Sequence, residues 1–138
     1  MIIVDTGPLV AAVLYADDDH RTCVDLFTSA HLSGEQLVVP SFVIPEACYL
    51  IQREAGPKVE ADFIRSLAAG DFAVAECEIV LDRIAELMEK YADLPLGVAD
   101  ASVVATAEEL GAREIATLDR RDFSVVRPRH TASFVLLP

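Results

Sequence analysis

Short apolar runs alternate along this chain with longer stretches in which apolar residues recur at helical spacing. The short runs predict buried strands, and the clearest of them cover residues 2–4, 37–39 and 115–118. Weaker candidates lie at 72–75, and edge strands are expected at 124–126 or 133–136. The helical spacing predicts helices over 8–15, 23–30, 43–51, 59–67, 80–91 and 100–110. Strands that alternate with helices are typical of an α/β fold around a mainly parallel sheet.

Capping and turn residues indicate where several of these elements begin and end. Ser41 is expected to cap the helix that follows the second strand, because a serine side chain can accept a hydrogen bond from a free helical N–H. Gly111 is expected to stop the last long helix, which is unusually rich in alanine and valine and is therefore expected to be buried. Residues 120–123 are expected to form a turn.

Length and composition restrict the class of protein. The chain has 138 residues, of which 53% are hydrophobic, which is enough to bury a core in one domain over residues 1–138. No apolar stretch reaches the length of a membrane span. The N-terminal residues MIIVD lack the basic segment of a secretory signal. We therefore expect a cytoplasmic protein with no membrane partner.

The formal net charge of −12 argues against broad electrostatic attraction to nucleic acid. The distribution of the basic residues weakens that objection, since five of the eleven lie in the last 26 residues: Arg113, Arg120, Arg121, Arg127 and Arg129. These five either belong to an ordinary solvated surface or form a local patch that contacts phosphate or an acidic partner. The sequence leaves both interpretations open.

Four acids stand in apolar surroundings where a strand is expected to end or a helix to begin: Asp5, Glu46, Asp100 and Asp119. An acid near a hydrophobic core costs free energy unless something compensates it. The carboxyl ends of parallel strands share one edge of the sheet, and ligands bind in the crevice there. Four separate parts of the chain are thus expected to deliver carboxylates to one crevice.

Each acid taken singly has an ordinary structural explanation. Asp5 and Asp100 are candidate helix N-caps, Glu46 can oppose the positive end of a helix dipole, and Asp119 is a common turn residue. Four such coincidences in apolar settings are less expected than one shared site. Oxygen ligands without His or Cys suit Mg²⁺ or Mn²⁺. A divalent ion among carboxylates serves the hydrolysis of a phosphodiester.

Two threonines adjoin this set of acids. Thr6 follows the first acid directly, and Thr117 lies two residues before the last. Each is either an ordinary residue at the end of a strand or a group that orients a ligand or a water molecule.

Four segments of the sequence together resemble one known family: IVDTGPLVA, VVPSFVIPEACYLI, YADLPLGVADASVVATAEELGA and EIATLDRRDFSVVRP. The family is that of the PIN-domain ribonucleases, specifically the VapC-type toxins of bacterial toxin–antitoxin pairs. The resemblance covers nearly the whole chain. It implies a three-layer α/β/α PIN-like fold and a hydrolase that acts as a Mg²⁺- or Mn²⁺-dependent endoribonuclease on RNA. It also implies a cognate antitoxin and a homodimer.

By this resemblance the four acids form the metal-binding and catalytic quartet, and Asp122 is an accessory acid. The chain departs from the pattern at Gly97, where many relatives carry a further Asp three residues before Asp100. The departure leaves open whether one ion or two operate.

Two other functions are alternatives to the nuclease. A phosphoacceptor signalling domain needs a lysine after a late strand, but the only lysines, Lys58 and Lys90, lie in expected helices. A catalytically weak PIN-like module that acts through protein partners stays open, because the acid expected at position 97 is missing.

Overall fold

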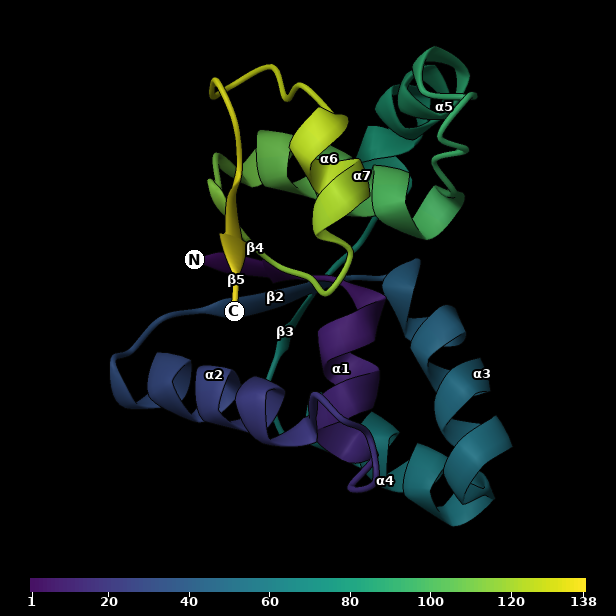
Figure 1. Cartoon of the computed structure of the whole chain (residues 1–138), viewed down its shortest axis with the longest axis vertical. Coiled ribbons are helices and arrows are strands. Elements are labelled where there is room, and N and C mark those ends of the chain that lie inside the picture. Colours follow the sequence, from purple (N-terminus) through teal and green to yellow (C-terminus); the bar gives the residue numbers. More distant parts are fainter.

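Five parallel strands form the centre of the computed structural model, which describes all residues 1–138 (Figure 1). The strands are β1 (Ile2–Val4), β2 (Leu37–Pro40), β3 (Ala73–Ala75), β4 (Glu114–Ala116) and β5 (Val135–Leu137). Their order across the sheet is β3-β2-β1-β4-β5. The sequence predicted a mainly parallel sheet, and every pair of neighbouring strands is in fact parallel.

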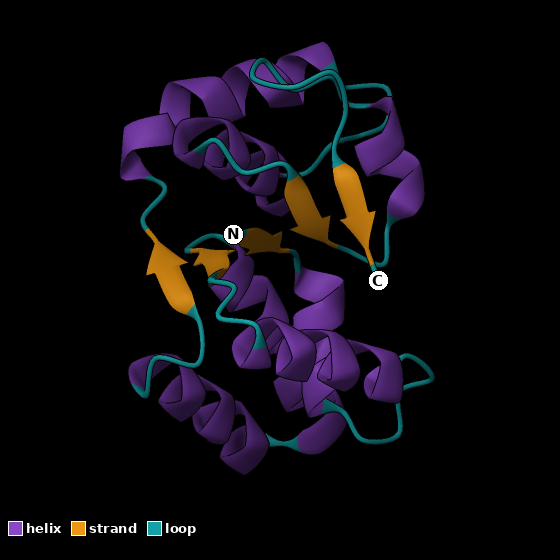
Figure 2. Cartoon of the chain, turned by 90° about the vertical axis from the view of Figure 1, so that its left-hand side faces the viewer, coloured by secondary structure: helices purple, strands orange, loops and turns teal.

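Helices cover both faces of this sheet (Figures 1 and 2). The lower layer in Figure 1 holds α1 (Thr6–Val13), α2 (His20–Leu32), α3 (Val43–Ala55) and α4 (Pro57–Ala68). The upper layer holds α5 (Leu81–Lys90), preceded by the 3₁₀ turn η1 (Glu78–Val80), together with α6 (Val98–Leu110) and α7 (Arg120–Val125). The three-layer α/β/α fold implied by the family resemblance is therefore confirmed.

Burial follows the pattern of the sequence. The two central runs of β1 and β2 are buried at every position, as expected for parallel strands that are covered on both faces. Helix α6 is buried on almost all sides, because it lies between the sheet and the pair formed by η1 and α5. Gly111 ends this helix in the left-handed region with φ of 69°, as predicted. No helix is both long and apolar enough to span a lipid bilayer.

Several predicted boundaries were wrong. Phe42, not Ser41, precedes the first residue of α3, and the Ser41 hydroxyl instead accepts a hydrogen bond from the Cys77 N–H at 3.1 Å. The expected turn at 120–123 is the beginning of helix α7. Residues 124–126 contain the end of that helix and no strand, and the edge strand is formed farther along by β5. A distant partner, Cys77, decided the role of Ser41, whereas α7 begins at a local N-cap, Asp119.

Candidate metal centre

The sheet topology creates the crevice in which the predicted acids meet. The chain runs from β1 to β2 and β3 on one side of the sheet and later adds β4 on the other side of β1. In open α/β sheets, ligands bind at the carboxyl ends of strands where the strand order reverses in this way. Asp5 directly follows β1, and its backbone N–H donates to the Ala116 carbonyl of β4 at 2.9 Å. The first acid thus lies at the switch point.

Asp5 is a buried acid that its surroundings satisfy only in part. It is 5% exposed, and its Oδ2 accepts a hydrogen bond from the Thr117 hydroxyl at 2.8 Å. Its Oδ1 is buried without a hydrogen-bond partner. Although Asp5 holds the N-cap position of α1, its side chain makes no capping hydrogen bond. The capping explanation for this acid is therefore wrong, and a buried lone pair is left for a ligand.

Burial raises the pKa of Asp5 from its ordinary value of 3.8 to about 7. The Thr6 N–H and the Thr117 hydroxyl lower this pKa in part, whereas the negative charges of Asp100 and Glu46 raise it further. The pKa of Asp100 rises to about 6, mainly by burial and then by repulsion from Glu46 and from two acids after β4. The carboxylates are thus close enough to perturb one another.

Glu46 reaches this crevice from the first turn of α3. Its side chain is exposed, and its Oε2 accepts a hydrogen bond from the Thr6 hydroxyl at 2.5 Å. Thr6 is the first residue of α1, so this bond joins the beginnings of two helices beside the end of β1. One oxygen of Glu46 is oriented by the protein, and the other remains available.

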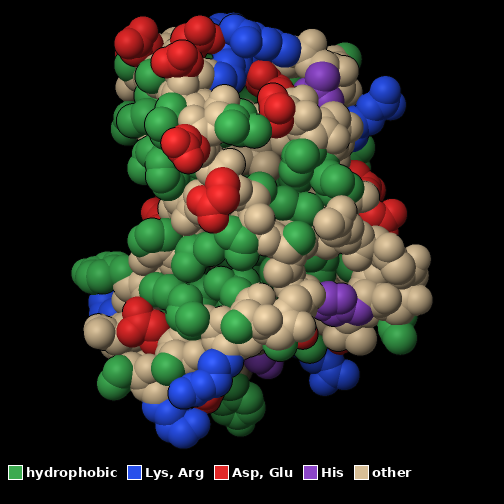
Figure 3. Space-filling model, turned by 180° about the vertical axis from the view of Figure 1, so that it is seen from behind, with side chains coloured by type: hydrophobic (Ala, Val, Ile, Leu, Met, Phe, Trp, Pro, Cys, Tyr) green, Lys and Arg blue, Asp and Glu red, His purple; other side chains and the backbone are tan.

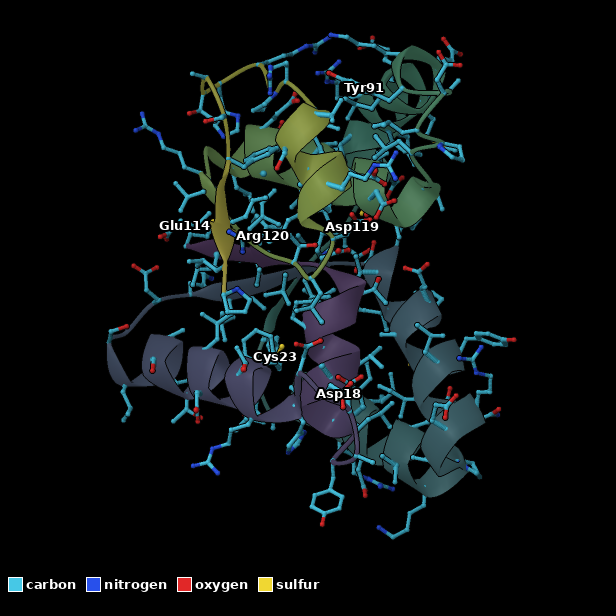
Figure 4. The ribbon with its side chains drawn as sticks, viewed as in Figure 1. Asp18, Cys23, Tyr91, Glu114, Asp119 and Arg120 are labelled. Atoms are coloured by element: carbon cyan, nitrogen blue, oxygen red, sulfur yellow. The ribbon has the colours of Figure 1, made fainter.

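Asp119 comes three residues after the last residue of β4 and precedes α7. The sequence had placed it directly after the strand, but β4 ends at Ala116. Its Oδ1 accepts a hydrogen bond from the Asp122 N–H at 3.3 Å, and its own N–H donates to the Thr117 hydroxyl at 3.0 Å. Asp119 is therefore a true N-cap with its carboxylate in the crevice region between the sheet and the upper helices (Figure 4).

Thr117 connects the two acids that follow β1 and β4. Its hydroxyl donates to Asp5 and accepts from the backbone of Asp119, so both hydrogen-bonding functions of one side chain are used. Asp122, one turn farther along α7, has a pKa raised by partial burial and by the neighbouring charge of Asp119. The structure thus brings both predicted threonines and the accessory acid to the same place as the quartet.

Asp100 is the third residue of α6, and Gly97 holds the N-cap position. The Gly97 N–H lowers the pKa of Asp100 through a hydrogen bond, which resembles the reciprocal bond of a capping box. The sequence-based interpretation of Asp100 as an N-cap is therefore wrong. Gly97 has φ of −77° and ψ of 172°, which any residue adopts, and a Cβ added there would meet only Asp100 Oδ2, at 3.9 Å. An Asp at position 97 would fit this backbone.

The oxygen ligands available suit a hard cation. No three Asp, Glu, His or Cys side chains stand close enough to enclose an ion by themselves. Mg²⁺ does not require such a cage, because it usually retains several water molecules and takes only one or two carboxylates directly. The unpartnered Oδ1 of Asp5 and the mutual repulsion of the acids are both relieved by a divalent ion. The residues present therefore fit Mg²⁺ or Mn²⁺.

The five C-terminal arginines do not form one patch. Arg127 and Arg129 line a surface hollow together with Arg83 and Lys90, whereas Arg113 lies beside another depression near β5. Arg120 donates to the carbonyl of Pro138 at 2.7 Å. The contribution of α5 to the hollow was missed, since nothing in the sequence connects residues about 40 positions apart.

Comparison with known proteins agrees with this geometry. The family model described as PIN domain matches residues 2–127. The chain is 35% identical to Ribonuclease VapC26 of Mycobacterium tuberculosis, over 99% of this chain and 100% of that protein. Its fold is similar to the crystal structure of VapC20 of the same species, described as a sarcin-ricin loop cleaving toxin.

The likeness to VapC20 concerns the fold alone. The TM-score is 0.76 at 18% identity, and the match covers 83% of this chain and 87% of the other. The family model and the full-length relative agree with one another, and the fold agrees with both. The chain therefore belongs to the PIN-domain family, among its VapC-type ribonucleases.

Proposed function

We propose that this protein is a Mg²⁺- or Mn²⁺-dependent endoribonuclease and the toxin of a toxin–antitoxin pair. Asp5, Glu46, Asp100 and Asp119 hold the metal ion, and the protein hydrolyses phosphodiester bonds of RNA. The observation that carries the proposal is the buried carboxylate of Asp5, which has a free oxygen and a pKa of about 7. Such a group is costly in a folded protein unless it serves a ligand.

A bound ion would lower the pKa of a water molecule, so that hydroxide is available to attack phosphorus, and it would neutralise the negative charge that develops on the phosphate. Asp5, directly after β1, and Asp119, the N-cap of α7, would hold the ion, and the Thr117 hydroxyl fixes the side chain of the first relative to the backbone of the second. Thr6 holds one oxygen of Glu46 and thereby directs the other. Asp122 serves as an accessory acid at the exposed side of the crevice.

The biological setting belongs to the same proposal. The full-length likeness to Ribonuclease VapC26 supports a cytoplasmic toxin that acts as one domain over residues 1–138, pairs with a small cognate antitoxin, and forms a homodimer. Light scattering of the purified protein tests the dimer, and a monomer at all concentrations contradicts that part of the proposal.

The test of the activity is cleavage of RNA by purified protein with Mg²⁺ or Mn²⁺. Wild type is expected to cleave, and Asp5→Asn to lose at least about 100-fold in rate, because it removes the central ligand. Asp18→Asn is the matched control, since Asp18 is exposed before α2 and distant from the crevice (Figure 4). Equal cleavage by wild type and Asp5→Asn, or none by wild type on total cellular RNA with either metal, contradicts the proposal.

A further inference from the structure

A hollow in the surface between α5 and the segment after α7 gathers the basic side chains of the upper layer. Its volume is about 810 Å³, and none of its lining residues is hydrophobic. Figure 3 shows basic side chains grouped at this upper end of the molecule, beside acidic ones. The charged residues that line it are Arg83, Lys90, Arg127 and Arg129 with Glu86 and Glu89.

Two of the four cations already have acidic partners. Arg83 binds Glu108 with two parallel hydrogen bonds of 2.9 and 3.0 Å, and it also contacts Glu86. Arg129 donates to Glu86 at 2.8 Å. These two arginines shape the wall of the hollow and neutralise one of its glutamates, so little of their charge is left for a ligand.

Lys90 and Arg127 have no ion-pair partner, and both are exposed. The same side chain, Tyr91, holds them in place. The Tyr91 hydroxyl accepts the Arg127 backbone N–H at 2.8 Å, and the Lys90 ammonium lies 5.4 Å from the centre of the Tyr91 ring. The guanidinium of Arg127 is further fixed by donation to the Ser124 carbonyl at 2.9 Å. Two ordered cations without an ion-pair partner therefore line one hollow, which Glu89 also lines, in a protein of net charge −12.

Helix α7 links this hollow to the acids. Asp119 caps the beginning of α7, and Arg127 follows two residues after its end. A helix rises 1.5 Å per residue, so the two ends lie roughly 10 Å apart, about three stacked nucleotides of a single strand. Figure 4 shows Asp119 at the lower end of α7 and Tyr91 near its upper end. A strand bound at the crevice can thus continue to the hollow.

We propose that this hollow binds a backbone phosphate of the RNA substrate, a few nucleotides from the bond that is cut. The inference rests on the proposed nuclease function and adds a substrate contact to it. A guanidinium and an ammonium side by side suit a phosphate group. The absence of apolar lining residues disfavours a protein segment, because protein contacts centre on buried aromatic and aliphatic anchors. Phosphate contacts position a strand without reading its sequence.

The experiment measures binding of a fluorescent single-stranded RNA of about 12 nucleotides in EDTA, so that no cleavage occurs. The test variant is Lys90→Gln with Arg127→Gln. The control variant, Arg21→Gln with Lys58→Gln, removes the same charge from α2 and α4 at the opposite end of the molecule, where both side chains are about 90% exposed. Neither variant replaces any of the four acids of the candidate metal site, and thermal melting confirms that both variants fold.

The test variant is expected to bind RNA roughly 20-fold more weakly than wild type at about 0.1 M salt, since each lost phosphate contact removes a factor of about five. The slope of log K against log salt should fall in magnitude by about 1.4, or 0.7 per contact. The control variant should change each quantity less than half as much. Equal weakening in both variants, or in neither, overturns the proposal, as does failure of wild type to bind.

Two further measurements separate this inference from its alternatives. With Mn²⁺ the test variant should cleave RNA with a raised KM and an unchanged kcat, and a fall in kcat alone contradicts a remote phosphate contact. If wild type binds RNA selectively through the hollow yet cleaves none, the nuclease proposal fails while the phosphate site stands. If the test variant loses binding to poly-glutamate and keeps binding to RNA, the hollow serves an acidic protein and the inference is wrong.

Discussion

The replacement Asp5→Asn should stabilise the metal-free protein while it abolishes activity. Asparagine has nearly the same shape as aspartate, remains a good N-cap residue, and can still accept the Thr117 hydroxyl. Asparagine carries no charge. Its burial therefore avoids the desolvation cost that raises the pKa of Asp5 to about 7 and that opposes folding once the unfolded chain has lost the proton. The replacement of the buried Asp5 by an uncharged residue of nearly the same shape thus separates the cost of the site to folding from its use in catalysis.

The magnitude follows from the two pKa values of Asp5. The folded value is raised, to about 7, whereas the unfolded chain has the ordinary value of 3.8. The folded state therefore holds its proton over a range in which the unfolded state has lost it, and stability falls as pH rises from 3.8 to 7. Each unit of pKa is worth roughly 1.4 kcal/mol, so the full penalty above pH 7 is about 4 kcal/mol. At pH 5 it is only about 2 kcal/mol.

Urea unfolding in EDTA at pH 5 and pH 8 measures this difference. The advantage of Asp5→Asn over wild type should grow by about 2 to 3 kcal/mol between the two pH values. Asp18→Asn, an exposed acid, should show no such growth. Saturating Mn²⁺ at pH 8 should stabilise wild type, by about 3 kcal/mol at 100 times its Kd, and leave Asp5→Asn unchanged. An advantage that is equal at both pH values refutes the reasoning.

Three other substitutions test the neighbouring contacts. Thr117→Val keeps the shape of the side chain but leaves Asp5 without its hydroxyl donor, so we expect Mn²⁺ affinity to fall about tenfold by calorimetry. Gly97→Asp adds an acid near Asp100; it should lower the stability of the metal-free protein by about 1 kcal/mol and increase the stabilisation by Mn²⁺, both measured by thermal unfolding. Glu108→Gln weakens a largely buried ion pair, and urea unfolding should show a loss of about 2 to 3 kcal/mol with kcat unchanged.

The sequence predicted the strands and long helices well where burial decides the pattern. A fully apolar run is typical of the centre of a parallel sheet, where both faces are covered, and β1 and β2 lie there as expected. Helix α6 is similar, because its row of alanines and valines can pack on every side. These elements follow from composition over several residues and do not depend on one partner elsewhere in the chain.

The errors occurred where a single distant partner decides the structure. Ser41 was expected to cap α3, but its hydroxyl binds the backbone of Cys77, 36 residues away. The segment 120–123 lacks strong apolar periodicity, yet it forms the beginning of α7 because Asp119 caps it and Phe123 is buried beneath it. The Ser41 contact and the burial of Phe123 exist only after the layers have packed, whereas the Asp119 cap is a local signal that the sequence contains.

The sequence could predict which acids lie near the crevice, but it could not predict the hydrogen bonds that link them. Acids after β1 and β4 are expected to lie close together if the sheet is parallel and the strands are neighbours, and the Thr117 hydroxyl indeed contacts both Asp5 and the backbone of Asp119. That Thr117 joins them through one hydroxyl depends on its rotamer and on the end of β4 at Ala116, two residues earlier than expected for the strand. The hollow at Lys90 and Arg127 depends on the position of α5 relative to the segment after α7, which the sequence does not encode locally.

The same reasoning gives the missing acid at position 97 a physical meaning. In the metal-free protein the carboxylates already raise one another's pKa, and an Asp at position 97 would stand beside Asp100 and increase that repulsion. The Gly97 N–H stabilises the charge of Asp100, as the backbone N–H of an Asp at this position also would. A chain with glycine here therefore folds with less electrostatic repulsion, and we expect it to bind fewer metal ions than a chain with Asp at this position. Titration of wild type and Gly97→Asp with Mn²⁺ should thus differ in the number of ions bound, and equal numbers would contradict this account of the glycine.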